Sequence, residues 1–285
     1  MQKLPTPELL FRSDANTGEG PLWSNGKVIW VDIPNGKINT TDASSGQTTT
    51  LTLDAVIGAA AEIENSNKFV IAMQDGFAIV DGTSFEVIDR VLDRTTHRMN
   101  DAKCDALGRL WAGSCELSFA QGMGALHILE SSGPSTIARD SFGLPNGIGW
   151  TQDNKRMYFV DSAAHQLYSA EFDLSEARVG DFAPLADVNI GFPDGLAVDV
   201  DDCVWLAVWG GAKILRISPQ GEVIAEIDMP VSQPSSCAFG PDGTLYITSA
   251  RKDLSGAQLA NQPLAGSLFA VPTNTRGVPV SKFRY

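Results

Sequence analysis

A short apolar triplet recurs along the chain at intervals of 40, 41, 47, 47 and 41 residues. The six triplets are centred at Val31, Ile71, Ala112, Phe159, Leu206 and Ile247. Each lies in an apolar run of strand length, and hairpin-forming dipeptides such as Asn25-Gly26 and Asp242-Gly243 accompany the runs. A period of about 40 to 50 residues with several short strands in each copy is typical of the blades of a β-propeller.

The six copies predict an all-β fold, a six-bladed β-propeller with four-stranded blades around a central channel. No linker-like or low-complexity stretch divides the sequence, so residues 1–285 are expected to form a single domain. Closure of the ring should pair Pro7–Phe11 with Gly266–Pro272 in the last blade. Ser255–Gln262 is the one segment expected to form a short helical turn. A pair of β-sandwiches is the alternative architecture, and it would not explain the period.

A residue with a side-chain oxygen lies eleven or twelve positions before an aromatic residue in five of the copies. The pairs are Glu19 with Trp30, Asn100 with Trp111, Asn146 with Tyr158, Asp194 with Trp205, and Ser235 with Tyr246; Ala59 takes the position in the remaining copy. Because the innermost strand of each blade lines the channel, these side chains should converge on the axis. Carboxylate and amide oxygens suit one divalent metal ion, Ca²⁺, Mg²⁺ or Mn²⁺, with Zn²⁺ and Fe²⁺ as alternatives. A turn role is the competing interpretation for each residue, because Glu-Gly, Asn-Gly and Asp-Gly pairs favour turns.

The charge and the apolar pattern exclude several classes of partner. A net charge of −13 argues against a nucleic-acid partner, because phosphate binding needs clustered cationic side chains. No run approaches the roughly 18 apolar residues of a membrane span, and the N-terminal apolar stretch is too short for a secretory signal. The four cysteines form no C-x-x-C pair. Cys104, Cys203 and Cys237 lie in apolar strand-like runs and are expected to be buried thiols. These features predict a cytoplasmic monomer or weak dimer with no membrane or nucleic-acid partner.

Six segments together resemble the SMP-30/gluconolactonase/luciferin-regenerating family. They are GEGPLW (18–23), RMNDAKCDALGRLWAG (98–113), LPNGIGWTQDNKRMYFVDS (144–162), PDGLAVDVDDCVWLAVWGG (193–211), SSCAFGPDG (235–243) and QPLAGSLFAV (262–271). The resemblance implies a six-bladed propeller with one catalytic divalent metal in its channel. The runs Trp209-Gly210-Gly211 and Ala250-Arg251-Lys252 look like those of bacterial sugar lactonases, which points to an aldonolactone substrate.

The resemblance also implies roles for individual residues. Glu19, Asn146 and Asp194 match the metal ligands of the family. Asn100 matches a fourth contact on the substrate side or through water. Arg98 matches a residue that binds a substrate hydroxyl or carbonyl group.

Two positions depart from the family pattern. Ala102 follows Asn100-Asp101 where the family often has glycine, and Glu116 is out of register with the acidic pair that animal members carry. The role of Glu116 is therefore left open. The loops Ser118–Gly124 and Arg251–Gly266 are expected to set substrate specificity.

A lactone is a cyclic ester, and its hydrolysis develops negative charge on the carbonyl oxygen that a bound cation can stabilise. The predicted function is a metal-dependent hydrolase that opens a sugar lactone to the aldonic acid, with Asp194 assisting the attack of water as general base. No G-x-S-x-G elbow supplies a serine nucleophile. The alternatives are another metal-dependent ester or phosphotriester hydrolase on the same scaffold, a non-enzymatic calcium-binding regulator, and a propeller interaction module.

Overall fold

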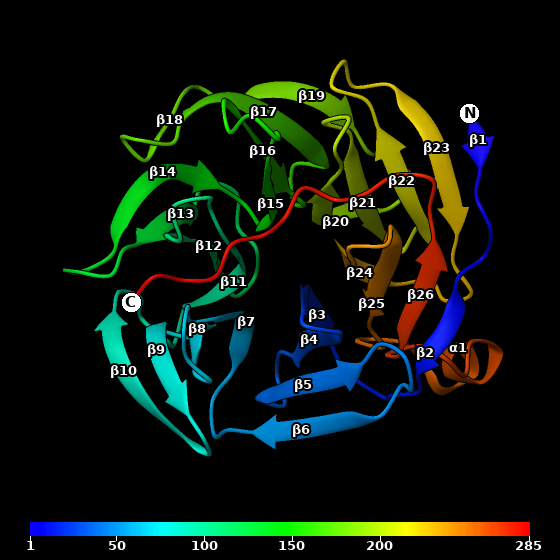
Figure 1. Ribbon diagram of the computed structural model, residues 1–285, viewed down its shortest axis with the longest axis horizontal. Helices are drawn as coiled ribbons and strands as arrows, with labels where there is room; N and C mark the ends of the chain where they lie inside the picture. Colours follow the sequence, from blue (N-terminus) through cyan, green and yellow to red (C-terminus); the bar gives the residue numbers. More distant parts are fainter.

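The computed structural model describes all 285 residues, and six sheets are arranged around a common axis (Figure 1). From the inner strand outward, the first blade consists of β3 (Gly18–Ser24), β4 (Lys27–Asp32), β5 (Lys37–Asp42) and β6 (Thr48–Thr52). The second consists of β7 (Ile57–Glu62), β8 (Phe69–Met73), β9 (Gly76–Asp81) and β10 (Ser84–Arg90). The third consists of β11 (His97–Cys104), β12 (Leu110–Glu116), β13 (Gly124–Leu129) and β14 (Thr136–Phe142).

The second half of the ring repeats this arrangement with small additions. The fourth blade consists of β15 (Pro145–Trp150), β16 (Arg156–Asp161), β17 (Gln166–Asp173) and β19 (Ala183–Asp187), with the short β18 (Arg178–Val179) also on β17. The fifth consists of β20 (Phe192–Val198), β21 (Val204–Trp209), β22 (Lys213–Ile217) and β23 (Val223–Asp228), with β1 (Gln2–Lys3) parallel to β23. The sixth consists of β24 (Pro234–Phe239), β25 (Thr244–Ser249), β26 (Leu268–Pro272) and β2 (Glu8–Phe11). The predicted six-bladed propeller with four-stranded blades is therefore confirmed.

The ring closes where the sequence predicted. Strand β2 pairs with β26 in antiparallel register, with Leu9 opposite Phe269, so the N-terminal strand completes the last blade. The predicted helical turn is α1 (Gly256–Asn261). Ser255 caps this helix, and its hydroxyl accepts a hydrogen bond from the Gln258 backbone N–H in a capping box. No helix of the structure has the length and apolar character that a membrane crossing would require.

The apolar core is divided into six clusters, each between two neighbouring blades. In one of them Val31 of the first blade and Ile71 of the second are both fully buried. In another, the Trp111 ring of the third blade lies 6.1 Å from the Trp150 ring of the fourth. The triplets that mark the repeat thus form the inter-blade contacts. Complete burial of each large apolar side chain contributes about 1.5–3 kcal/mol, so these layers hold the ring together. All four cysteines are free and buried, as predicted for Cys104, Cys203 and Cys237.

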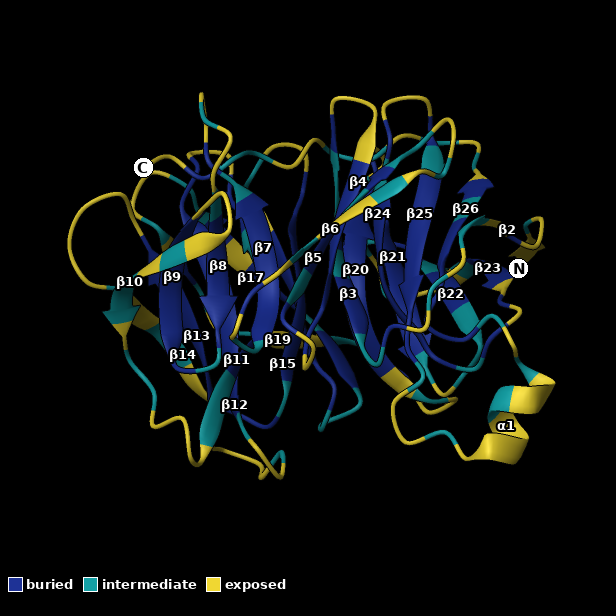
Figure 2. Cartoon of the chain, turned by 90° about the horizontal axis from the view of Figure 1, so that it is seen from below, coloured by how far each residue is buried: buried dark blue, intermediate teal, exposed yellow.

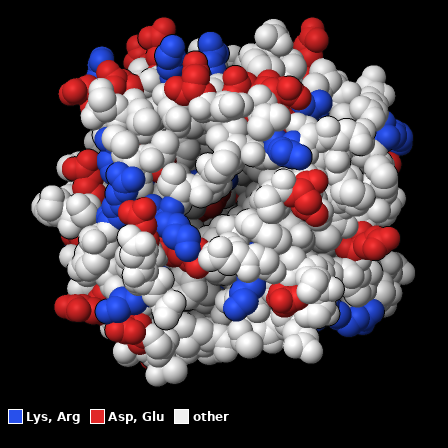
Figure 3. Space-filling model, viewed as in Figure 1, with Lys and Arg blue, Asp and Glu red and all other residues white.

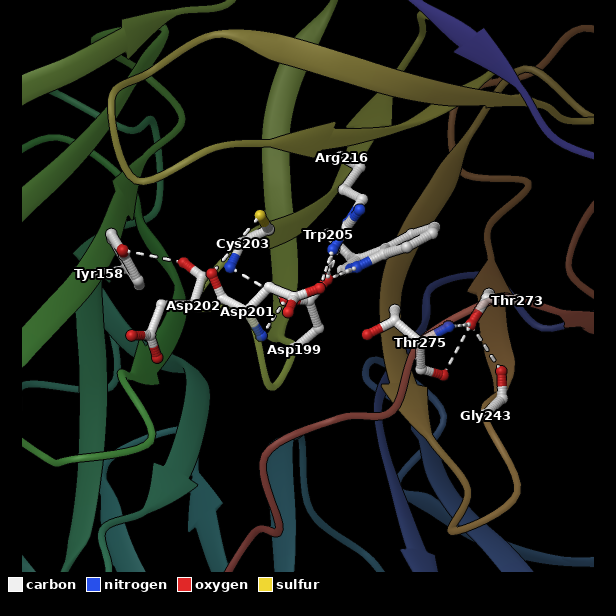
Figure 4. Close-up of polar contacts among 10 residues, drawn as sticks. All are labelled: Tyr158, Asp199, Asp201, Asp202, Cys203, Trp205, Arg216, Gly243, Thr273 and Thr275. Carbon is white, nitrogen blue, oxygen red and sulfur yellow. Dashed lines mark hydrogen bonds and ion pairs between the residues drawn. The ribbon is translucent and has the colours of Figure 1, made fainter.

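Two aspartates in tight turns anchor the tryptophans in the second strands of the third and fifth blades, whereas Trp30 in the first blade donates to Thr41. The buried Asp199 carboxylate accepts hydrogen bonds from the Cys203 backbone N–H at 3.0 Å and from Trp205 Nε1 at 2.8 Å (Figure 4). Arg216 Nε donates to the same carboxylate at 2.8 Å. In the third blade Asp105 likewise accepts from Trp111 Nε1, at 2.9 Å. An aspartate six residues before the tryptophan therefore secures the turn and satisfies the buried indole N–H.

We expect Asp199→Ala to lower the free energy of unfolding by about 2–4 kcal/mol, because it leaves the buried Trp205 indole N–H and the Cys203 backbone N–H without an acceptor. It also removes one of the two carboxylates that the half-buried Arg216 guanidinium binds. Denaturant titration measures the loss. Asp201→Ala is the matched control, since the exposed Asp201 side chain binds only Arg216, at 2.8 Å, and should cost no more than about 1 kcal/mol. Equal losses in the two variants would contradict the role assigned to Asp199.

His127 is buried inside the third blade, where its Nε2 lies 2.8 Å from the Ser114 hydroxyl. Burial lowers the pKa of His127 to about 4. Because the unfolded chain binds this proton with a pKa of about 6.5, the neutral imidazole stabilises the fold fully above pH 6.5. This stability is lost progressively as the pH falls from 6.5 towards 4.

We therefore expect His127→Gln to flatten the decrease in unfolding free energy between pH 6.5 and pH 4, by up to about 1.4 kcal/mol per pH unit. Denaturant titrations of both proteins across this range measure the effect. Parallel pH profiles for the two proteins would show that His127 does not titrate in this way.

The C-terminal segment (273–285) crosses one end of the channel, an arrangement that the sequence did not predict (Figure 1). The Val278 backbone N–H donates to Val198 O in the fifth blade, and Phe283 pairs with Ile63 in the second. Phe283 is fully buried in the cluster between the second and third blades. Figure 2 shows that this segment and α1 lie on opposite faces of the ring.

Candidate active site

The pairing between the first and second strands is interrupted at the same level in every blade. Asn100, Asn146 and Asp194 lie within these interruptions, and Glu19 lies at the edge of its own, opposite Val31. Such bulges leave residues outside the regular ladder and re-aim their side chains. The inner strands are neighbours around the axis, so the re-aimed side chains from four blades can meet in the channel.

The dipeptides at these positions are not turns. Asn146-Gly147 and Asp194-Gly195 lie inside β15 and β20. A Cβ atom at Gly147 would stand 2.7 Å from Asp194 O, and one at Gly195 would stand 2.0 Å from Ser236 Oγ. Glycine is therefore needed for the close approach of neighbouring blades, and the turn interpretation of these pairs is wrong. It holds for Asn25-Gly26, which joins β3 to β4 with positive φ at both residues.

A cavity of about 650 Å³ opens on the α1 face of the ring. Five sequence-predicted residues line it, and we call them the axial site: Glu19, Arg98, Asn100, Asn146 and Asp194. Ser235 was also expected to face the axis, but it does not line this cavity, because its hydroxyl donates to Gly18 O at 2.5 Å. No histidine lines the cavity.

Hydrogen bonds fix the orientation of both amides in the axial site. Asn100 Nδ2 donates to Pro145 O at 2.8 Å and to Asn146 Oδ1 at 2.7 Å. Arg98 donates to Asn100 Oδ1 at 2.6 Å. Asn146 Nδ2 donates to the Ser162 hydroxyl at 2.8 Å, so the oxygen of Asn146 is directed towards Asn100. A carbonyl oxygen accepts two hydrogen bonds or ligands, and one acceptor position of Asn146 Oδ1 is left for a further partner.

Two carboxyl groups are buried next to each other in the axial site. Glu19 and Asp194 are each 6% exposed and line the same cavity, close enough for each carboxyl group to influence the pKa of the other. Burial, and then the nearby carboxylates of Asp194 and Asp101, raise the pKa of Glu19 well above its usual range. Burial and the Asp101 carboxylate do the same to the pKa of Asp194, against the opposing effect of Arg98. Buried like charges are unfavourable unless a cation or a proton compensates them.

The donor chemistry of the axial site fits a hard divalent cation. It offers two carboxylates and amide oxygens and has no sulfur or imidazole, which is the ligand set of Ca²⁺, Mg²⁺ or Mn²⁺. No group of three or more His, Cys, Asp and Glu side chains suited to a metal ion is present. A metal here would therefore depend on the Asn146 oxygen in addition to the Glu19 and Asp194 carboxylates.

Sequence reasoning gave no role to two charged residues below the axial site, the buried Asp101 and the half-buried Lys103. Asp101 and Lys103 line a second cavity of about 390 Å³ at the other end of the channel, where the C-terminal segment also contributes. Lys103 Nζ donates to Leu196 O at 2.6 Å. Burial lowers the pKa of Lys103, while the Asp101 carboxylate opposes this shift. Figure 3 shows a hollow at the axis on this face, with acidic and basic side chains interspersed around it.

Both predicted specificity loops contribute to the cavity wall. Phe119 comes from the first loop, and Lys252 and Asp253 come from the second. The Arg98 guanidinium lies 5.8 Å from the centre of the Phe119 ring, within the range of a cation–π contact. Glu116 does not line the cavity. Its Oε2 accepts a hydrogen bond from the Ser118 backbone N–H at 2.8 Å, so it holds the loop that carries Phe119.

Comparison with known proteins identifies the family of this chain. The SMP-30/Gluconolactonase/LRE-like region matches residues 17–251. The chain belongs to this family. A Bacillus subtilis (strain 168) protein named as a proposed sugar lactone lactonase, YvrE, is 31% identical over 91% of this chain and 92% of its own length. The 6-deoxy-6-sulfogluconolactonase of Pseudomonas putida is 30% identical over 95% and 96%. A crystal structure of a calcium-binding protein, regucalcin, from Agrobacterium tumefaciens superimposes with a TM-score of 0.91 over 100% of this chain and 99% of its own, at 25% identity.

The departure of this chain from the family's glycine after Asn-Asp has a local explanation. The Ala102 backbone N–H donates to Asp101 Oδ1 at 2.8 Å, directly after the interruption in β11. Ala102 has no positive φ angle. The conformation is one that alanine adopts without strain, so glycine is not required there.

We expect Glu19→Gln or Asp194→Asn to stabilise the protein in the presence of a chelator, by an amount on the order of 1 kcal/mol, because each removes one of two buried like charges. Thermal unfolding in EDTA at neutral pH measures the change. Asp253→Asn is the matched control, since its side chain is 83% exposed at the cavity wall and its Tm should stay near that of the wild type. A lower Tm in both Glu19→Gln and Asp194→Asn would contradict repulsion between the two buried carboxylates.

Proposed function

We propose that this chain is a divalent-metal-dependent hydrolase that opens sugar (aldono) lactones to aldonic acids. The observation that carries the proposal is the buried pair of carboxyl groups, Glu19 and Asp194, with raised pKa values beside the Asn146 amide in a polar axial cavity. Two adjacent buried carboxyl groups repel each other when both are ionised, and a bound cation would compensate this charge. A hard cation is the partner that these oxygens can share.

Glu19, Asn146 and Asp194 would hold the cation, one from each of three blades. When bound, it would supply a positive charge that stabilises the carbonyl oxygen as it becomes negative and that activates water. The metal identity is not set by this donor set, so Ca²⁺, Mg²⁺, Mn²⁺, Zn²⁺ and Fe²⁺ are all to be tested.

The residues of the chain would divide the remaining tasks. Arg98 would bind a hydroxyl or carbonyl oxygen of the lactone at the cavity wall, where its guanidinium is already oriented by Asn100 and Phe119. Asp194 would accept the proton of the attacking water as general base. Water adds to the carbonyl carbon, the ring C–O bond breaks, and the ring oxygen leaves as a hydroxyl group after taking up a proton. Asn100 would orient Arg98 and Asn146 in addition to facing the substrate.

The names of the relatives support the lactone, and they also keep one alternative open. One relative is a sulfogluconolactonase, which favours an aldonolactone as the substrate class. The structural relative is described as a calcium-binding protein, which favours a calcium-binding regulator as the second candidate. A regulator would bind Ca²⁺ and hydrolyse none of the lactones with any metal. A phosphotriester or other ester hydrolase would instead turn over those esters faster than lactones.

We expect chelated wild-type protein to be inactive on a panel of aldonolactones and to recover activity with one or more divalent metals. A pH-drop assay measures ring opening. Glu19→Gln, Asn146→Ala and Asp194→Asn should lose more metal affinity and activity than the roughly 10–100-fold that removal of an outer-shell partner costs. Asp181→Asn, which changes an exposed side chain away from the cavity, should keep both. If calorimetry showed full metal affinity in all three variants of the proposed ligands, the proposed metal site would be refuted.

We expect Arg98→Ala to lower kcat/KM by about 10- to 100-fold, the loss of a hydrogen bond of 1.5–3 kcal/mol from a charged group. Metal affinity should stay within a few-fold of the wild type, because Arg98 contacts the substrate and not the cation. Steady-state kinetics and calorimetry on one preparation test both statements. Loss of the metal in this variant would place Arg98 among the groups that hold the metal site.

A further inference from the structure

The carbonyl oxygen directly before each proposed metal ligand accepts a hydrogen bond from a side chain of the preceding blade. Gly18 O, before Glu19, accepts from Ser235 Oγ at 2.5 Å. Pro145 O, before Asn146, accepts from Asn100 Nδ2 at 2.8 Å. Pro193 O, before Asp194, accepts from Ser162 Oγ. The same contact therefore occurs three times around the ring, and each time it lies next to a ligand.

The position of these carbonyl groups, beside the interruptions in strand pairing, indicates what the contacts do. Regular pairing of the inner strand stops next to all three ligands. Backbone that leaves a ladder loses the hydrogen bonds that would otherwise fix it. At each of these places a side-chain donor from the neighbouring blade adds a hydrogen bond to a carbonyl group at the edge of the paired segment. The backbone before each ligand is thereby held relative to the blade beside it.

Ser162 makes a second contact that acts on a ligand side chain. A serine hydroxyl has a single hydrogen to donate, and the Pro193 carbonyl oxygen can only accept, so the hydrogen of Ser162 is committed to it. Ser162 Oγ must then accept from Asn146 Nδ2, 2.8 Å away. This fixes which end of the Asn146 amide faces the cavity. The nitrogen is turned to Ser162, and the oxygen is left for a cation.

We propose that Ser162 and Ser235 are positioning residues of the metal site, which hold Asn146, Asp194 and Glu19 from the neighbouring blades. The inference rests on the proposed function, since it concerns the same cation. Ser162 is 2% exposed and Ser235 is fully buried, and Ser235 does not line the axial cavity. In this role Ser162, which lines the axial cavity, and Ser235 are neither nucleophiles nor direct ligands. Both act through the residues that they orient, as outer partners of metal ligands do.

The test measures the affinity for Ca²⁺ and Mn²⁺ by calorimetry and the Tm in EDTA for four proteins. These are the wild type, Ser162→Ala, Ser235→Ala and the control Ser249→Ala. Ser249 is equally buried, and its hydroxyl donates to a backbone carbonyl, Ser267 O, at 2.7 Å, but that carbonyl precedes no ligand. We expect about 10-fold or greater weakening of metal binding in the first two variants. The control should lose stability in EDTA while its metal affinity stays unchanged.

The possible outcomes separate this inference from the function on which it rests. Wild-type protein that binds no divalent metal refutes the proposed function, and the positioning role falls with it. Wild-type binding with unchanged affinity in Ser162→Ala and Ser235→Ala refutes the positioning role alone. Equal weakening in all three serine variants also refutes it, because the loss would then follow general stability.

A second comparison tests the orientation of the Asn146 amide. In Asn146→Asp both terminal atoms are oxygens, so no partner is needed to choose the end that faces the cation. Ser162→Ala should therefore weaken metal binding less in the Asn146→Asp background than in the wild type, and a double-mutant cycle measures the difference. An equal loss in the two backgrounds would contradict the orienting role of Ser162.

Discussion

The interruption of strand pairing at one level of the channel is the constraint on which the rest of the axial site depends. A regular inner strand would alternate its side chains and present its backbone to its own blade. In this structure each inner strand leaves that register near its polar residue, and Asn100, Asn146 and Asp194 are freed to face one another. Gly147 and Gly195 allow the blades to approach closely enough for these side chains to meet.

The stabilising and the functional parts of the molecule are separated in space. Stability comes from the apolar layers between blades and from turn anchors such as Asp199, which lie away from the axis. The axial site instead destabilises the fold, since it buries the carboxyl groups of Glu19 and Asp194 near each other. The surrounding ring fixes the positions of the two residues and so offsets the cost of burying them together. A rigid ring can therefore hold a site that is unfavourable on its own.

Hydrogen bonds between blades connect these two parts. Asn100 links the third blade to the fourth, Ser162 links the fourth to the fifth, and Ser235 links the sixth to the first. In each case a buried polar group is satisfied by the neighbouring blade, as buried polar groups generally must be. The geometry of the site is thereby tied to the packing of the ring, and changes in distant inter-blade contacts can reach it.

The period of the apolar triplets was enough to predict six blades, because each blade must bury the same faces against its neighbours. The shared spacing to an aromatic residue also singled out Glu19, Asn100, Asn146 and Asp194, which do line one cavity. The same reasoning was wrong for Ser235, because a register position specifies the level along the axis but not the direction of a side chain within a bulge. It also missed Ser162, whose partners come from two blades and leave no local pattern.

The sequence by itself thus determined the elements that repeat, namely strand order, blade number, ring closure through Leu9 and Phe269, and the level of the polar residues. Only the tertiary structure decided contacts between residues far apart in the chain. Among these are the proximity of Glu19 to Asp194, the direction of the Asn146 amide, and the path of the C-terminal segment to Phe283. The physical reason is that each blade buries its apolar triplet in the same way, so this burial is visible in the spacing of residues along the sequence. Electrostatic and hydrogen-bonding partners across the channel are instead chosen by the closed ring, which no single repeat contains.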